Sequence, residues 1–278
     1  MVDTGRGHNA CERKSLILLL QYRVGPVAGC ATPSSMRPTV RYEIKYRISP
    51  QIAEDVMHYI SRYMTADEHG EGGSADYPVH SLYLDSPDFS TYWDTQKKAY
   101  SRFKIRARCY NFEPQRSFFL EIKSRSGEAM TKTRALATVT ETKDVLGGFQ
   151  PDRPLEQYDS GLHAFLKARD DRRARSTCWI TYQRSAFVGG ERGLVRVTFD
   201  TNIRAGLATV DLSEPQLWYD LPEVRGLTVL EVKYTGSYPA WVAEAVRRCN
   251  LNRSSMSKYR QGIEALAARN LIPALRAP

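Results

Sequence analysis

Charged and apolar residues alternate along several short stretches of this chain. Glu43-Ile44-Lys45, Glu121-Ile122-Lys123 and Glu231-Val232-Lys233 repeat one pattern three times. Alternate side chains of an extended strand share a face, so in each stretch Glu and Lys point one way and the β-branched residue points the other. In residues 102–109 and 195–200, charged or polar residues occupy every second position and mostly apolar residues occupy the positions between them. The pattern predicts strands with one charged face and one apolar face.

Two interpretations of the charged face are open. Ordinary antiparallel strands place their charged side in water and their apolar side on the core. Such a solvent face usually mixes Ser, Thr, Gln and Lys, whereas Arg and Lys dominate here. If the sheet closes into a barrel, the charged face becomes its interior. Each unpaired buried charge costs several kcal/mol, so that interior must hold water, metal and a polyanion.

The periodicity also predicts the order of helices and strands. Several long antiparallel strands with inserted helices are typical of an α+β fold. Ser86 or Asp88 is expected to cap the second helix. Helices are expected at 50–64, from about 88, and at 140–146, 155–168, 239–250 and 256–270, and strands at 38–48, 77–84, 100–111, 118–124, 130–139, 179–188, 194–200, 203–210 and 227–234.

The composition limits the kinds of binding partner and of cysteine chemistry that the protein can have. The chain has 278 residues, enough for one large domain, and a formal net charge of +9. This charge favours an anionic partner: a nucleotide, polyphosphate, nucleic acid or anionic lipid. The five cysteines form no C-x-x-C pair, which argues against zinc and a redox dithiol and fits a reducing cytoplasm.

The ends of the chain are expected to lie outside the main domain. Residues 1–35 are predicted to be a disordered extension or a mis-annotated start ahead of Met36. The domain itself is expected at 36–270, followed by a tail at 271–278. The apolar run at 15–20 is too short to span a membrane, and no other segment approaches that length.

Taken together, the motifs resemble the VTC domain, the catalytic module of vacuolar transporter chaperone polyphosphate polymerases, in the triphosphate tunnel metalloenzyme (CYTH-like) superfamily. The resemblance covers about Met36 to Ala267, in the expected order. The residues that carry it are Arg41 to Arg47, Ser81 to Ser86, Arg102 to Arg108, Glu121-Ile122-Lys123, Tyr182-Gln183-Arg184, Arg196 to Asp200, Glu231-Val232-Lys233 and Ser257-Lys258-Tyr259-Arg260.

The resemblance implies a closed antiparallel β-barrel with helices packed outside, whose tunnel binds triphosphate. It implies transfer of the γ-phosphoryl group of ATP onto polyphosphate with release of ADP, assisted by Mn²⁺ or Mg²⁺. Lys258 and Arg184 are expected in the active centre. Glu231 is the leading metal ligand, and Glu43 and Glu121 either bind metal too or hold neighbouring cations. The implied phosphate ligands are Lys45, Arg106, Arg108, Lys123, Lys132, Arg184, Arg196 and Lys233.

Other functions stay open at this stage. The same tunnel could transfer the phosphoryl group to water, which would make the protein a triphosphatase for tripolyphosphate or nucleoside triphosphate. A sensor that binds polyphosphate or nucleotide without turnover is the non-catalytic alternative. No recognition helix or RNA-binding aromatic motif is present, so nucleic acid is not expected as a partner. ATP and polyphosphate are the expected partners. The protein is expected either to act alone in the cytoplasm or to dock on a separate membrane protein.

Overall fold

The computed structural model describes residues 41–67, 75–127, 129–148, 159–189, 194–273 and 275. All of them belong to one compact unit, Thr39–Pro278. The extension expected at 1–35 lies outside the described residues. Of the tail expected at 271–278, residues 271–273 and 275 are described.

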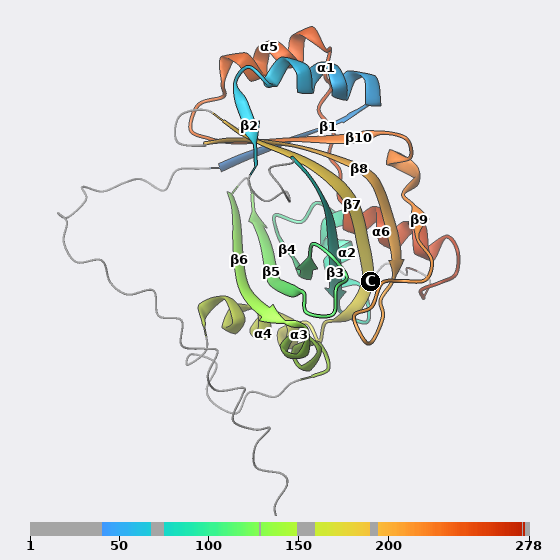
Figure 1. Ribbon diagram of the computed structural model, residues 1–278. Helices are drawn as coiled ribbons and strands as arrows, with labels where there is room; N and C mark the ends of the chain where they lie inside the picture. The colour runs from blue at the N-terminus through green and yellow to red at the C-terminus, as the bar shows by residue number, and fades with distance from the viewer. Residues whose placement is uncertain are drawn as a thin grey trace, which may run out of the picture. The chain divides into compact units, whose positions relative to one another are not determined.

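Ten strands form one antiparallel sheet around which the rest of the unit is built (Figure 1). Its main path runs β1-β10-β8-β7-β3-β4-β5-β6, so the first and last strands of the chain are neighbours; β2 and β9 pair with β7 and β8. The strands are β1 (Arg41–Ile48), β2 (Met64–Ala66), β3 (Asp76–Asp85), β4 (Ser101–Cys109), β5 (Ser117–Ser126), β6 (Ala129–Thr138), β7 (Arg175–Gly189), β8 (Val195–Leu207), β9 (Tyr219–Asp220) and β10 (Thr228–Thr235).

The sheet is strongly curved, but it is not closed. In the described residues its two edge strands, β1 and β6, are not hydrogen-bonded to each other, so the α+β class is confirmed and the closed barrel is not. Figure 1 shows the strands curling around a concave face. Side chains cross that face: the Lys123 ammonium on β5 lies 2.7 Å from a carboxylate oxygen of Glu43 on β1.

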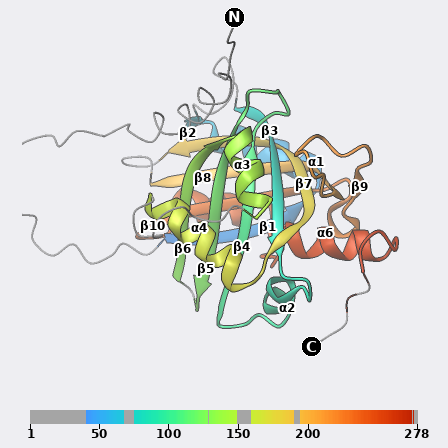
Figure 2. The same ribbon diagram turned by 90° about the horizontal axis from the view of Figure 1, so that it is seen from below.

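Helices cover the convex face of the sheet (Figures 1 and 2), where the apolar side chains of the strands are buried. Helices α1 (Pro50–Ile60) and α5 (Ala240–Arg248) pack over the β1, β10 and β8 side. Helices α3 (Val139–Leu146) and α4 (Ser160–Asp171) pack over β5 and β6. These contacts bury Ile44, Ile122 and Val232, the apolar residues of the three repeated stretches, at least in part. The apolar face therefore points outward to the helices and leaves the charged face on the inside of the curve.

Helix α6 (Lys258–Ala267) instead packs on the concave side, against β7 and β8. Gly262 lies at this close approach, where an added Cβ atom would come within 2.3 Å of the Ile180 Cδ1 atom, so the Ile180 side chain would have to shift. The short helix α2 (Ser90–Gln96) and the 3₁₀ turn η5 (Pro222–Val224) border it. The arrangement brings the start of α6 to the charged face.

Some local predictions differ from the structure. The helix expected at 50–64 ends at Ile60, and the strand β2 begins at Met64. The strands expected at 194–200 and 203–210 are one strand, β8, which continues through Asn202 at φ 52° because Asn tolerates the left-handed conformation. The N-cap of α2 is Phe89, with no side-chain cap bond, so Asp88 is not the cap. The Asp85 carboxylate accepts from the backbone of Thr91 and Tyr92, and the Ser86 hydroxyl accepts from Ser90.

None of the helices in the described ranges combines the length and the apolarity that crossing a bilayer requires.

Candidate active site on the concave face

The concave face gathers the charged side chains predicted from the strand pattern. Strand register places all eight expected phosphate ligands, together with Glu43, Glu121 and Glu231, on this one side. We call these residues, with Asp200 and Lys258, the charged face. All of them except Arg196 fall into three groups, which are organised around Glu231 with Glu43, around Glu121 and around Asp200.

Glu231 and Glu43 form the centre of the first group. Glu231, 5% exposed, lies 3.2 Å from Lys233 and 4.0 Å from Lys45 and from Arg184. Glu43 contacts Lys45 at 3.0 Å and Lys123 at 2.7 Å. Opposite charges face each other across β1 and β10, since Glu43 pairs with Lys233 and Lys45 with Glu231.

The electrostatics of this group keep both carboxylates ionised. Burial alone would raise the pKa of Glu231, but Lys233 and Lys45 outweigh it and hold that pKa well below its usual range. Burial and the nearby Glu231 act to raise the pKa of Glu43, and Lys45 and Lys123 lower it overall. Two adjacent carboxylates that stay ionised supply oxygen ligands of the type that a divalent metal such as Mg²⁺ prefers.

Glu121 organises the second group, on β4, β5 and β6. Its carboxylate accepts from the Arg106 guanidinium at 2.7 and 2.8 Å, pairs with Lys132, and lies 3.9 Å from Arg108. Burial opposes ionisation, yet these cations lower the pKa of Glu121 to about 2. Within the described part of the chain, the ion pairs and hydrogen bonds of the Glu121 carboxylate are with Arg106, Arg108 and Lys132. Its geometry therefore favours the second expectation for this residue, that it holds neighbouring cations in place.

Asp200 organises the third group and was not among the predicted site residues. It is fully buried and receives two hydrogen bonds from Arg184, at 2.7 and 2.8 Å. The Lys258 ammonium, at the first residue of α6, lies 2.6 Å from it. Burial would raise the pKa of Asp200, but Arg184 and Lys258 lower it to about 2. Both expected active-centre residues are thus held by one carboxylate. The alternation of Arg196, Thr198 and Asp200 along one strand is the sequence pattern that could have identified Asp200 as a residue of the charged face.

Arg196 is held at another margin of the charged face. Its guanidinium pairs with Asp67 at 2.5 Å and donates to the Tyr77 hydroxyl at 2.9 Å, while its Nε has no hydrogen-bond partner in the described residues. Asp67 follows β2, far from Arg196 in sequence, so no local pattern could reveal this pair.

Tyr83 and Tyr182 contact cations of the charged face, and Tyr259 stacks on Tyr83. The Tyr83 hydroxyl accepts from Arg106 at 3.0 Å, and its ring stacks on Tyr259, whose hydroxyl donates to Asp85. Tyr182 lies at a register shift in β7, where it accepts from Arg108 at 3.3 Å. The Lys258 ammonium lies 4.7 Å from the centre of the Tyr182 ring. The sequence alone does not predict the hydrogen bond of Tyr83 to Arg106, because a tyrosine's hydrogen bond has no sequence signature.

The residues around Glu231 fit a divalent metal. The described residues contain no group of three or more His, Cys, Asp or Glu side chains placed to hold one. Two carboxylates suffice for Mg²⁺ or Mn²⁺ when phosphate oxygens and water complete the shell. Thr198, directly across from Glu231, is fully buried, and its hydroxyl lacks a hydrogen-bond partner in the described part of the chain. Oxygen donors from Glu231, Glu43 and Thr198 are the appropriate type.

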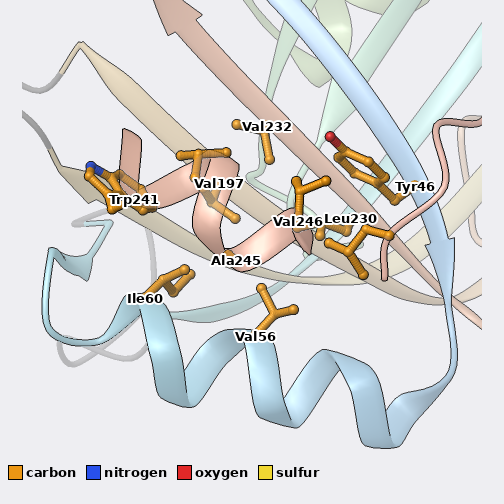
Figure 3. Close-up of a pocket in the computed structure, with 11 residues that line it drawn as sticks. Tyr46, Val56, Ile60, Val197, Leu230, Val232, Trp241, Ala245 and Val246 are labelled. Carbon is orange, nitrogen blue, oxygen red and sulfur yellow. The ribbon is translucent and has the colours of Figure 1, made fainter. Parts of the chain in front are cut away.

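A cavity on the convex side is a packing gap rather than a second site (Figure 3). It lies between α1, α5 and the sheet, where Val56, Ile60, Trp241 and Val246 contribute to an apolar lining. Its free volume of about 10 Å³ is at the lower limit for one water molecule, and it offers that water few polar partners.

Comparisons with known proteins identify the family. The chain shares 10% identity with the PH1819 protein from Pyrococcus Horikoshii OT3, whose solved structure aligns over 80% of this chain and 99% of that one with a TM-score of 0.39. No curated protein matches the sequence significantly. The VTC domain family model matches residues 40–267, which contain the whole charged face. The chain therefore belongs to the VTC domain family.

Proposed function

We propose that this protein is a metal-dependent polyphosphate polymerase that transfers the γ-phosphoryl group of ATP onto a polyphosphate chain and releases ADP. The observation that carries the proposal is the charged face itself. Its cations outnumber its carboxylates, and they line one side of a curved sheet whose other side is covered by helices. Family membership points to polyphosphate metabolism, and the charged face suits a linear polyanion.

The arrangement suits phosphoryl transfer because that reaction depends on positioning and charge neutralisation. Arg106 and Arg184 are held by Glu121 and Asp200, so their guanidinium groups need little reordering to bind phosphate oxygens. Lys45, Lys123 and Lys233 supply point charges around Glu43 and Glu231. A bound Mn²⁺ or Mg²⁺ would neutralise charge on the phosphates of ATP.

Lys258 is proposed to act where the two phosphate chains meet. It lies at the start of α6, whose N-terminal end carries a partial positive charge, and Asp200 holds its ammonium in place. In this proposal Lys258 and Arg184 stabilise the negative charge that develops on the transferred group. The closed tunnel belongs to the same proposal: bound phosphates would bridge the β1 side and the β5–β6 side, which Glu43 and Lys123 already connect.

The triphosphatase is the second candidate function, and one observation favours it. The sheet is open between β1 and β6 in the described residues, so no backbone ladder seals that side of the charged face from water. Water there would compete with polyphosphate as the acceptor. The two reactions share every residue discussed above and differ only in what receives the phosphoryl group.

One experiment separates these functions. Purified protein is incubated with ATP and Mn²⁺ or Mg²⁺ while ADP, free phosphate and long-chain polyphosphate are measured together. ADP matched by polymer is the expected result. ADP matched by free phosphate would assign the triphosphatase instead. Binding of ATP or polyphosphate with no turnover would overturn both enzyme proposals and leave the non-catalytic sensor.

A further inference from the structure

Beyond Arg106 and Lys123, the same side of the sheet carries three more cations that belong to none of the groups described above. Arg102 and Lys104 lie on β4, on the same side as Arg106, and Arg125 lies on β5. Arg102 stands directly across from Arg125, and Lys104 directly across from Lys123. Two successive cross-strand pairs therefore carry like charges.

These three cations differ from the rest in lacking carboxylate partners. Arg102 donates to the Ala99 carbonyl at 2.5 Å, and Arg125 donates to the Gly127 carbonyl at 2.8 Å. Within the described ranges, no carboxylate lies within ion-pair distance of Arg102, Lys104 or Arg125. By contrast, Arg106, Arg184 and Arg196 each contact a buried acid.

Such an arrangement is unfavourable for the protein alone. Like charges placed directly opposite on neighbouring strands are destabilising. Lys104 is half-buried, and burial together with Lys45, Lys123 and Arg106 lowers its pKa to about 7. A bound anion would remove this repulsion, because it would supply the negative charge that the chain does not provide here.

The position and composition of the group indicate the kind of anion. Arg106 lies four positions after Arg102 on the same strand, which is ~13 Å of extended backbone. The group therefore lengthens the charged face along the strand direction. No aromatic side chain alternates with the cations on this side of β4, since Phe103 and Ile105 point to the other. Single-stranded nucleic acid is usually held by such aromatics, whereas a phosphate chain without bases needs only charge.

We propose that Arg102, Lys104 and Arg125 form an extension of the charged face that binds additional phosphates of a long polyphosphate chain. The inference rests on the proposed function for the identity of the ligand. It adds that the affinity for polyphosphate rises with chain length beyond tripolyphosphate, and that these three residues cause the rise.

The test compares the affinity for tripolyphosphate with that for polyphosphates of defined greater length, by calorimetry without ATP. Two variants are used: Arg102→Gln with Arg125→Gln, and Lys104→Met alone. The matched control is Arg247→Gln with Arg248→Gln, which removes two exposed cations from α5 on the convex side. It produces the same change in net charge as the first variant.

We expect the double variant to bind long chains about tenfold more weakly, with a smaller salt dependence, while it binds tripolyphosphate as the wild type does. Lys104→Met should reduce the same preference, and the control should retain it. The proposal is overturned if the wild type binds long and short chains equally, if both variants keep the preference, or if single-stranded RNA of matched charge binds equally tightly. Because the assay contains no ATP, a protein that binds long chains but lacks polymerase activity would contradict the proposed function alone.

Discussion

Replacing Asp200 with Asn tests whether one buried carboxylate holds the active centre together. The change keeps the size of the side chain and removes its charge. Arg184, 9% exposed in its side chain, and Lys258, 12% exposed, would then lose their closest anion. Among the carboxylates of the described residues, Glu231, at 4.0 Å from Arg184, is the one that remains within ion-pair distance.

The structure sets the size of the effect. The pKa of Asp200 falls from 3.8 to about 2 on folding, against burial, because Arg184 and Lys258 stabilise its charged form. At about 1.4 kcal/mol per pKa unit, this shift corresponds to about 2 kcal/mol of stability. Since the folded pKa is the lower one, that stability is present above pH 3.8 and is lost as the pH falls through about 2. Leaving two buried cations without their partner raises the expected cost to about 3–5 kcal/mol.

Urea unfolding at neutral pH and at several pH values down to 2 measures both effects. We expect the Asp200→Asn variant to unfold at lower urea and to show a weaker loss of stability in acid than the wild type. Asp171→Asn is the control, because its ion pair with Lys167 is exposed and should contribute less than about 1 kcal/mol. Equal stability of wild type and Asp200→Asn, with the same acid profile, would refute this account of the third group.

Other substitutions test the remaining groups. Glu231→Gln should abolish metal-stimulated turnover while the circular dichroism spectrum is unchanged; full activity would show that Glu231 is not a metal ligand. Tyr83→Phe removes the hydroxyl that accepts from Arg106, and should weaken tripolyphosphate binding by about 1 kcal/mol in calorimetry without altering the urea midpoint. An unchanged affinity would mean that Tyr83 does not position Arg106. Lys104 has its pKa lowered from 10.5 to about 7, so the folded state binds fewer protons and stability should rise between those pH values. Lys104→Met should remove that rise and raise the urea midpoint at pH 6.5; an identical pH profile would contradict the pKa shift.

The strand pattern predicted most of the charged face from the sequence. A period of two assigns each residue to a face whatever the neighbouring strand is, so Lys45, Arg106 and Glu231 could be placed on one kind of surface without a structure. The same reasoning identified the outward apolar positions, such as Ile122 and Val232, which the helices of the convex side cover in full or in part. The strand periodicity could not identify the ion-pair partner of each charged side chain.

Those partners depend on contacts between distant parts of the chain. Asp67 meets Arg196, Glu43 meets Lys123, and Asp200 meets Lys258 only after the sheet has curved and α6 has packed against it. Each contact joins residues that are 58 or more positions apart, beyond the reach of any local periodicity. Local sequence patterns therefore did not reveal that Asp200 and Tyr83 position cations of the charged face, although both residues lie within the motifs that resemble the family.

The α+β class, the faces of the strands and membership of the VTC domain family can be obtained from the sequence, because they follow from local periodicity and short motifs. Three features depend on tertiary packing: the described parts of β1 and β6 are not paired, α6 lies on the concave side, and each buried carboxylate has its particular cation partners. Strand closure and charge pairing are set by non-local packing, in which burial makes every unpaired charge costly and so selects the arrangement that pairs most of them.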